Sequence, residues 1–150
     1  MEAFTNTDAE LTREKYYELV DYTLSHPDPA FIHQLVVDVF TAQQADNSTK
    51  PIAIVFALIG LHLHIDHGYS GKKVQQAHIR LAKRRNHWPV LPLPEERGEL
   101  TVADVVAAIS GDERDALIES WCTSVWNAYR AVQDHIRDLV QKELFGFKCK

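Results

Sequence analysis

The sequence predicts an all-α fold, a compact bundle of five to six mostly antiparallel helices that ends in a long C-terminal helix. Apolar residues recur at spacings of three and four along most of the chain, whereas the alternating runs typical of strands are short. Capping residues precede the apolar stretches, and glycine or proline follows them. We expect one helical domain over residues 1–150, a common size for a single domain.

The first two helices are marked by residues that cap free backbone N–H groups. Thr7 and Glu10 have the spacing of a capping box, in which each side chain covers the backbone N–H of the other. This pair predicts a first helix from about Thr7 to Ser25. Asp28 followed by Pro29 predicts the start of the second helix, because proline is favoured at the first helical position.

The third helix is expected over residues 51–67. Its middle, residues 52–61, is apolar on all sides, which predicts a central helix with neighbours on most faces. Gly68 ends it, because glycine tolerates the left-handed conformation of a helix C-terminus. Ser70 caps a fourth helix that is expected to run to about Arg85. The short links between these helices favour antiparallel neighbours.

A proline-punctuated segment and two further helices complete the chain. Residues 88–94 are interpreted as a connection that packs over the bundle, with a lid or a partner's ligand as alternatives. Thr101 and Asp104 predict the start of a short fifth helix. The last and longest helix is expected over about residues 112–145, where apolar residues have the spacing of a bundle seam. The sequence leaves open whether it is broken near Trp126.

Composition and charge disfavour two classes of partner. The net charge is −5, from 16 basic and 21 acidic side chains, whereas nucleic-acid-binding domains usually carry the opposite sign. The basic stretch at residues 72–85 is interpreted as a solvated face, with an anion-binding or nucleic-acid-binding surface as the alternative. The longest apolar run, residues 52–61, has half the length that a bilayer span needs. We expect no membrane association.

The two cysteines indicate a reducing compartment. Cys122 lies in an apolar helical stretch, where we expect a buried and unreactive thiol, and Cys149 lies in a polar tail. Residues 1–11 are acidic and polar, unlike a signal peptide. We therefore expect a cytoplasmic protein. No nucleophile elbow, phosphate-binding loop or dinucleotide fingerprint is present in the sequence.

Several of the eight histidines are expected at one end of the bundle. If the second and third helices form an antiparallel hairpin, His33 lies level with His62. The fourth helix returns beside the third, which brings His78 within about one turn of the same level. His64 crowds this end, and Asp66 follows His62 by four residues on the same helix face.

Imidazoles with a carboxylate predict a site for a divalent transition metal, which would be zinc, nickel, iron or manganese. The candidate ligands are His33, His64, His78, His62 and Asp66. His135 is a further candidate on the last helix. No HExxH, paired ExxH or HxxxH motif occurs, so the alternative of ordinary capping or core histidines stays open. Asp38, near Gln34, is interpreted as a solvated or interhelical polar position.

Four stretches of the sequence resemble a bacterial family of small helical proteins of unknown function. They read HQLVVDVFTAQQAD, KPIAIVFALIGLHLHIDHGYSG, VQQAHIRLAKRRNHWP and LTVADVVAAISGDERDALIESWCTSVWNAY. The likeness covers about residues 31–129. The matching positions are His33, Asp38, Gln43, His64, Gly68, His78, Trp88, Pro89, Trp121 and Trp126. The resemblance supports the helical fold, implies no reaction, and favours His64 over His62 as a ligand.

Two features of related proteins are not carried over. Many members of that family begin with a cysteine-rich CPGCG-like segment, and nothing before Phe31 matches it. A remoter analogy is to DinB-like four-helix bundles, which use three histidines. Their closing histidine pair is missing from the last helix, where Ala131 stands four residues before His135.

The sequence leaves two hypotheses for a function that it does not fix, and it leaves the question of enzymatic activity open. The first is a metal-binding helical bundle with hydrolase or transferase activity on a small molecule. His33, His64 and His78 would be its ligands, and His62 or Asp66 a ligand, a group that orients a ligand, or a general base. The alternative is a non-enzymatic interaction or scaffold module, a homodimer, that uses the tryptophans, among them Trp121 and Trp126, and the proline-punctuated residues 88–94. These tryptophans lie on different sides of the last helix.

Overall fold

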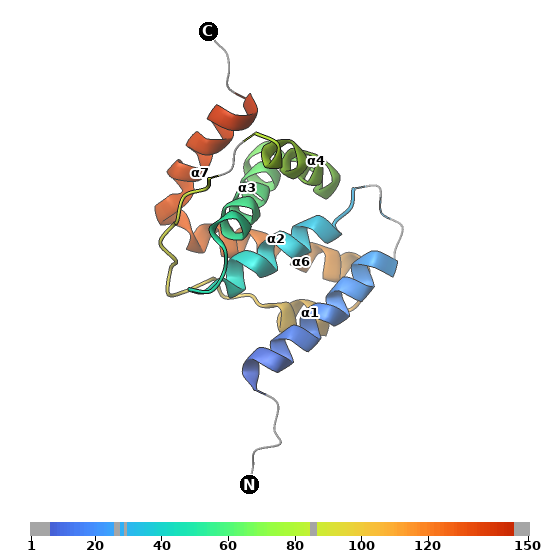
Figure 1. The fold of residues 1–150 in the computed structure, drawn as a ribbon. Coiled ribbons are helices and arrows are strands. Elements are labelled where there is room, and N and C mark those ends of the chain that lie inside the picture. Colours follow the sequence, from blue (N-terminus) through green and yellow to red (C-terminus); the bar gives the residue numbers. More distant parts are fainter. Residues whose placement is uncertain (1–6, 26–27, 29, 85–86, 146–150) are drawn as a thin grey trace.

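The computed structural model describes residues 7–25, 28, 30–84 and 87–145, and all its regular elements in these ranges are helical (Figure 1). They are α1 (Asp8–Ser25), α2 (His33–Gln44), α3 (Pro51–His67), α4 (Gly71–Ala82), α5 (Val102–Ala107), α6 (Asp112–Ala128), the 3₁₀ turn η1 (Arg130–Val132), α7 (Gln133–Val140) and the π-helical turn η2 (Gln141–Phe145). The predicted all-α bundle is confirmed. Within the described ranges, no helix combines the length and apolar character needed to cross a bilayer.

Three of the helix starts predicted from the sequence have the expected caps. The backbone N–H of Thr7 donates to Glu10 Oε1 at 2.8 Å, and the N–H of Glu10 donates to Thr7 Oγ1 at 3.0 Å. Ser70 caps α4, and Thr101 with Asp104 forms a second capping box at the start of α5. Because each cap satisfies N–H groups that a helix start leaves free, these side chains fix where the helices begin.

The second helix begins later than predicted. The Asp28 carboxylate accepts the backbone N–H groups of Ala30 (3.0 Å) and Ile32 (2.6 Å). Phe31 then has a left-handed φ of 57°, which interrupts helical geometry, so that α2 starts at His33. The prediction of a helix start at Pro29 was wrong for this reason, although Pro29 itself lies outside the described residues. Asp28 stabilises a turn before the helix.

The C-terminal helical region is divided after Ala128. The hydroxyl of Tyr129 donates to the carbonyl oxygen of Ala42 on α2. The side-chain amide of Gln133 donates at 2.9 Å to the carbonyl oxygen of Trp126, which also accepts the backbone N–H of Tyr129 at 3.1 Å. The break lets α7 leave α6 at a steep angle and pass beside α3 (Figure 1). The question that the sequence left open near Trp126 is thereby answered.

The third helix lies at the centre of the bundle, as its apolar pattern predicted. It contacts α2, α4, α6 and α7, and all residues from Ala57 to Leu63 are buried. The interior around α3 also contains Trp121 and Trp126, whose exposed fractions are 0% and 2%. Side chains attached to α3 near its C-terminal end are therefore held by neighbours on several sides.

Helices α2 and α3 approach closely where Asp38 faces Gly60. A Cβ atom added to Gly60 would lie 1.9 Å from Asp38 Oδ2, so the absence of a side chain at this position makes room for the carboxyl group. Burial raises the pKa of Asp38 well above its ordinary value, and Gln34 Nε2 donates to Oδ1 at 3.1 Å. Oδ2 is fully buried and has no hydrogen-bond partner among the described residues. Asp38 is thus an interhelical group, one of the two interpretations that the sequence allowed.

We expect Gly60→Ala to destabilise the protein by roughly 1–3 kcal/mol, the usual cost of overpacking a core. The added methyl group must displace the Asp38 carboxyl, which outweighs the gain in helix propensity of at most about 1 kcal/mol. Urea unfolding of Gly60→Ala, of Asp38→Ala and of the double variant Gly60→Ala/Asp38→Ala measures the free energy of coupling between the two positions. The double variant should be more stable than Gly60→Ala alone. A Gly60→Ala protein as stable as the parent would contradict this account.

Candidate acid–base site

A pocket of about 460 Å³ opens between α3, α7 and η2. The side chains that line it are two histidines, a carboxylate, a guanidinium, an amide and two apolar groups, namely His62, Asp66, His67, Arg137, Val140, Gln141 and Phe145. A larger depression of about 540 Å³ near α6 is lined by glutamates, an arginine and small polar residues, and contains no histidine or cysteine. Because its lining includes histidines, the pocket between α3, α7 and η2 is the better candidate for a catalytic site among the described residues.

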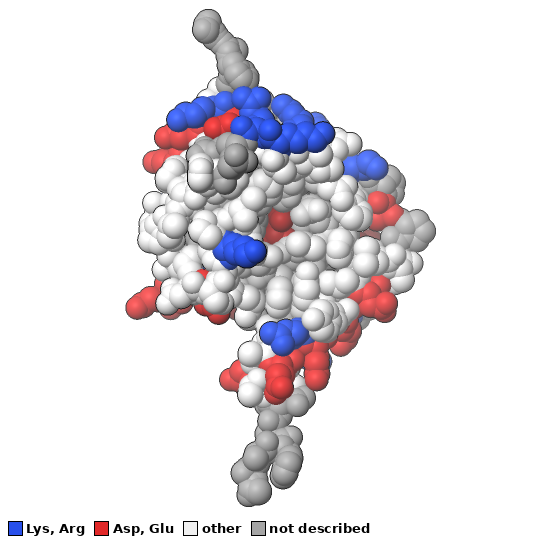
Figure 2. Space-filling view, viewed as in Figure 1, with Lys and Arg blue, Asp and Glu red and all other residues white. Residues whose placement is uncertain are grey.

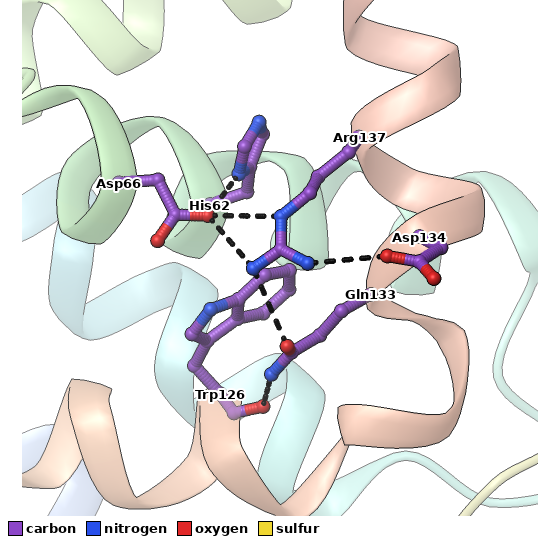
Figure 3. Close-up of polar contacts among 6 residues, drawn as sticks. All are labelled: His62, Asp66, Trp126, Gln133, Asp134 and Arg137. Atoms are coloured by element: carbon purple, nitrogen blue, oxygen red, sulfur yellow. Dashed lines mark hydrogen bonds and ion pairs between the residues drawn. The ribbon is translucent and has the colours of Figure 1, made fainter.

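His62 and Asp66 form a hydrogen-bonded pair in this pocket. Because they are four residues apart on α3, both lie on one helix face, as the sequence predicted. The distance between His62 Nδ1 and Asp66 Oδ2 is 2.8 Å. The same carboxylate oxygen accepts from Nε and Nη2 of Arg137 on α7, each at 3.3 Å (Figure 3). Asp66 thus fixes the imidazole and is itself fixed by Arg137.

This geometry sets the protonation state of His62. Burial lowers the pKa of the imidazole below its ordinary value, and its hydrogen bond to Asp66 opposes this only in part. The ring is therefore neutral at pH 7. A carboxylate can only accept, so the proton is on Nδ1 and the lone pair is on Nε2. Nε2 has no hydrogen-bond partner among the described residues, and it is not one of their fully buried polar atoms.

Aromatic and polar groups hold Arg137 and His62 in place. The guanidinium of Arg137 lies 6.0 Å from the ring of Trp126, and the His62 ring centroid lies 5.8 Å from the same indole. Arg137 also donates to Gln133 Oε1 at 3.4 Å and to Asp134 Oδ1 at 3.3 Å (Figure 3). Trp126 therefore forms a rigid apolar support beneath both side chains.

His33 and His78 do not join this pair. His33 Nδ1 lies 3.0 Å from Thr23 Oγ1 on α1. His78 Nε2 lies 2.8 Å from the carbonyl oxygen of Phe56, and its Nδ1 lies 3.5 Å from Gln34 Nε2. Burial lowers the pKa of both imidazoles, so both are neutral groups of helix packing at pH 7.

His64 lies between two hydrogen-bond acceptors, an arrangement that favours its charged form. Its Nδ1 lies 2.6 Å from the carbonyl oxygen of Tyr69, and its Nε2 lies 2.6 Å from Glu119 Oε1 on α6. Both contacts form together only when both ring nitrogens carry a proton. The hydrogen bond to Glu119 is the main cause that raises the pKa of His64. The imidazolium also suits the negative C-terminal end of α3.

The five predicted metal ligands thus separate into one pair and three individual residues. Among the described residues, no three His, Cys, Asp or Glu side chains lie close enough to hold a metal ion. The hairpin argument predicted the positions of His33 and His78 along the helix axes. It could not predict the directions of their side chains. His135 is exposed on α7 and does not line the pocket. The presence of a metal stays a prediction.

Sequence reasoning missed the contribution of α7 and η2 to the pocket. Arg137 and Phe145 were treated as parts of one long helix, in which their direction relative to α3 could not be derived. The spacing of Gln133 and Arg137 marks them as one helix face, and this was the available signal. Only the break after Ala128 turns this face towards Asp66.

The tryptophans and residues 88–94 serve packing within the described chain. Trp121 Nε1 donates to Gln43 Oε1 at 2.9 Å, and Trp126 supports the pocket. Trp88 packs edge-on against Phe56 at 5.0 Å, and Leu91 belongs to the core. Both tryptophans of α6 are buried, and Trp126 contacts His62 of α3 and Arg137 of α7. The predicted homodimer stays a prediction.

Lys and Arg side chains gather at the end of the molecule where α4 and η2 lie, whereas Asp and Glu side chains are frequent around α1 (Figure 2). Two basic residues of this region contact η2. Arg80 Nη2 donates to the carbonyl oxygen of Leu144 at 3.4 Å, and Arg84 Nε pairs with Glu143 at 3.5 Å. Part of the basic stretch therefore ties α4 to the segment that closes the pocket.

The fold and the pocket define a helical-bundle protein with a His–Asp pair at the end of its central helix. Residues 12–130 match the model of the Family of unknown function (DUF5946), and the chain belongs to this family. The family resemblance seen in the sequence is thereby confirmed, and the match begins earlier than residue 31. The matched range, residues 12–130, contains His62, Asp66 and Trp126 but ends before Arg137. No curated protein and no solved structure matches the chain.

We expect the charged state of His64 to make stability depend on pH. The folded-state pKa is raised, so the contribution is complete below the ordinary pKa of about 6.5 and is lost as pH rises through the folded value. The loss should be about 1 kcal/mol, the usual contribution of one hydrogen bond. Urea unfolding from pH 5.5 to 8.5 measures it, with His64→Gln as the variant that removes the titration. An equal pH dependence in parent and variant would assign it to other groups.

Proposed function

We propose that this protein binds a small molecule in the pocket between α3, α7 and η2, and that His62 acts there as a general acid–base catalyst. The observation that carries the proposal is the hydrogen bond from His62 Nδ1 to Asp66, which leaves the basic Nε2 without a protein partner in a pocket. A general base must be neutral, oriented and within reach of its substrate. The burial of His62 supports its neutral form, and its hydrogen bond to Asp66, which Arg137 holds in place, supports its orientation.

The reaction class that suits this arrangement is hydrolysis or group transfer. His62 Nε2 would accept the proton of a water molecule or of an acceptor hydroxyl group while the oxygen attacks the electrophilic centre. The same proton would then pass from Nε2 to the leaving group as its bond breaks, which returns His62 to its neutral form. Asp66 stabilises the imidazolium that exists between the two transfers, as carboxylates do in other catalytic pairs.

We expect His62→Gln to lower the rate of such a reaction by about 10²–10⁴-fold, the usual contribution of general acid–base catalysis. Asp66→Asn should lower it as well, because an amide can donate to Nδ1 and so stabilises the wrong tautomer. A panel of small uncharged esters, amides and phosphate triesters provides the screen. His135→Gln, on an exposed position of α7 outside the pocket, is the matched control. An activity that survives in His62→Gln would refute the assignment.

A second candidate function, binding of a divalent transition metal, is favoured by one observation at the same pocket. Histidines that bind metals commonly donate their other ring N–H to a carboxylate, as His62 does to Asp66. The ring of His67 lies 5.0 Å from that of His62, centroid to centroid, so that two imidazoles border the pocket. Water or a substrate would supply the other ligands. His33, His64 and His78 would first have to give up their present hydrogen bonds.

We expect zinc or nickel to bind exchangeably, because two imidazoles leave most of the coordination shell to water. Elemental analysis by plasma mass spectrometry after incubation with zinc, nickel, iron or manganese measures the bound metal. Binding should be lost in His62→Gln and kept in His33→Gln, whose side chain faces Thr23. Equal retention in both variants would place the metal elsewhere. No retention in the parent protein would leave His62 as a metal-free acid–base group.

A further inference from the structure

We propose that the pocket selects uncharged ligands that present an O–H, N–H or S–H donor to His62 Nε2 and a flat apolar body to Phe145. This inference rests on the proposed function, because it takes His62 Nε2 as the atom that meets the ligand. It goes further in naming the chemical class of the ligand. Three features of the pocket support it: the lone pair of His62 Nε2, the balance of charges and the aromatic wall.

The acceptor character of Nε2 follows from the hydrogen bonds of its ring. Asp66 Oδ2 takes the Nδ1 proton at 2.8 Å, so the other ring nitrogen of neutral His62 offers a lone pair. An acceptor group on a ligand, such as a carbonyl or carboxylate oxygen, would face this lone pair without a proton between them. A donor group would complete the hydrogen bonding of His62.

The charges around the pocket are already paired. Arg137 contacts Asp66 through Nε and Nη2 and contacts Asp134 through Nη1, all at 3.3 Å. Arg137 also donates to the neutral Gln133, and its guanidinium faces the ring of Trp126. An anionic ligand at Arg137 would lie beside the negative charges of Asp66 and Asp134, and a cationic ligand at Asp66 would lie beside the positive charge of Arg137. Each kind of charged ligand would therefore meet a charge of its own sign next to its partner, and this repulsion opposes its binding.

The wall beyond His62 is apolar and aromatic. Val140 is 1% exposed, and the ring of Phe145 packs against that of His67 with centroids 5.2 Å apart at an angle of 66°. Phe145 is half-buried and lines the pocket, so part of its ring is available for contact with a ligand. Pockets that combine an apolar wall with one oriented polar atom bind small uncharged molecules well.

Four probes of one shape and different chemistry test the inference: benzyl alcohol, toluene, benzoate and benzylamine. The protein is titrated at pH 8, and binding is followed through the Val140 methyl signals and the side-chain nitrogens of His62 in NMR spectra. We expect benzyl alcohol to bind at least about tenfold more tightly than benzoate or benzylamine, a difference of about 1.4 kcal/mol. It should also bind more tightly than toluene, and it should shift the resonance of His62 Nε2.

A variant identifies the acceptor atom. His62→Phe removes the lone pair and keeps an aromatic ring above Trp126, so the preference for benzyl alcohol over toluene should disappear, whereas His135→Gln should keep it. The comparison of the four probes on the parent protein does not depend on the folding of this variant. Equal or tighter binding of benzoate, or no binding of any probe, would overturn the ligand class. The nitrogen shifts of ligand-free His62 test the proposed function separately, because a proton on Nε2 would contradict the His62–Asp66 arrangement itself.

Discussion

The close packing of α2 on α3 at Gly60 is the constraint on which the rest of the structure depends. The Asp38 carboxyl occupies the space where a larger residue would place its Cβ, and Gln34 holds its other oxygen. Burial removes the hydration of a charged carboxylate in this position, and the imidazole of His78, whose Nε2 lies 3.8 Å from Asp38 Oδ2, is itself held neutral by burial. These two facts explain why burial raises the pKa of Asp38 so far. The neutral carboxyl group of Asp38 is more stable than the carboxylate in this buried position. This contact brings α2 against the central helix, and α4, α6 and α7 pack against other faces of α3.

The candidate site depends on a second structural decision, the division of the C-terminal helical region at η1. A continuous helix would carry Arg137 onwards along the axis of α6. Tyr129 is instead held by its hydroxyl group on α2, and the side-chain amide of Gln133 donates a further hydrogen bond to the carbonyl oxygen of Trp126. The chain then turns so that α7 lies against α3. This change of direction brings Arg137 into contact with Asp66, and residues of η2 line the pocket. The pocket is therefore a product of tertiary packing at both of its sides.

Local chemistry decided how much could be predicted from the sequence. The capping boxes at Thr7 and Thr101 and the apolar middle of α3 act over a few residues, and the predictions built on them are confirmed. The His62–Asp66 pair could be predicted because one turn of helix fixes it. The start of α2 was misplaced because the left-handed turn at Phe31 has no strong sequence signal. His33 and His78 were predicted to lie together, and the structure places them with separate partners. A correct prediction would have required the rotation of each helix about its axis, which long-range packing sets.

Two histidines at the end of α3 show how partners, more than position, decide what an imidazole can do. His62 and His64 are two residues apart and share the C-terminal end of one helix. His64 lies between a carbonyl oxygen and a carboxylate, so both its nitrogens donate and the charged form is favoured. His62 meets one carboxylate whose charge is already shared with Arg137, and its burial favours the neutral form. His64 is therefore saturated and serves packing, since a ligand finds no free nitrogen on it. His62 retains one basic nitrogen, and for that reason the chemistry of this bundle is to be sought at His62.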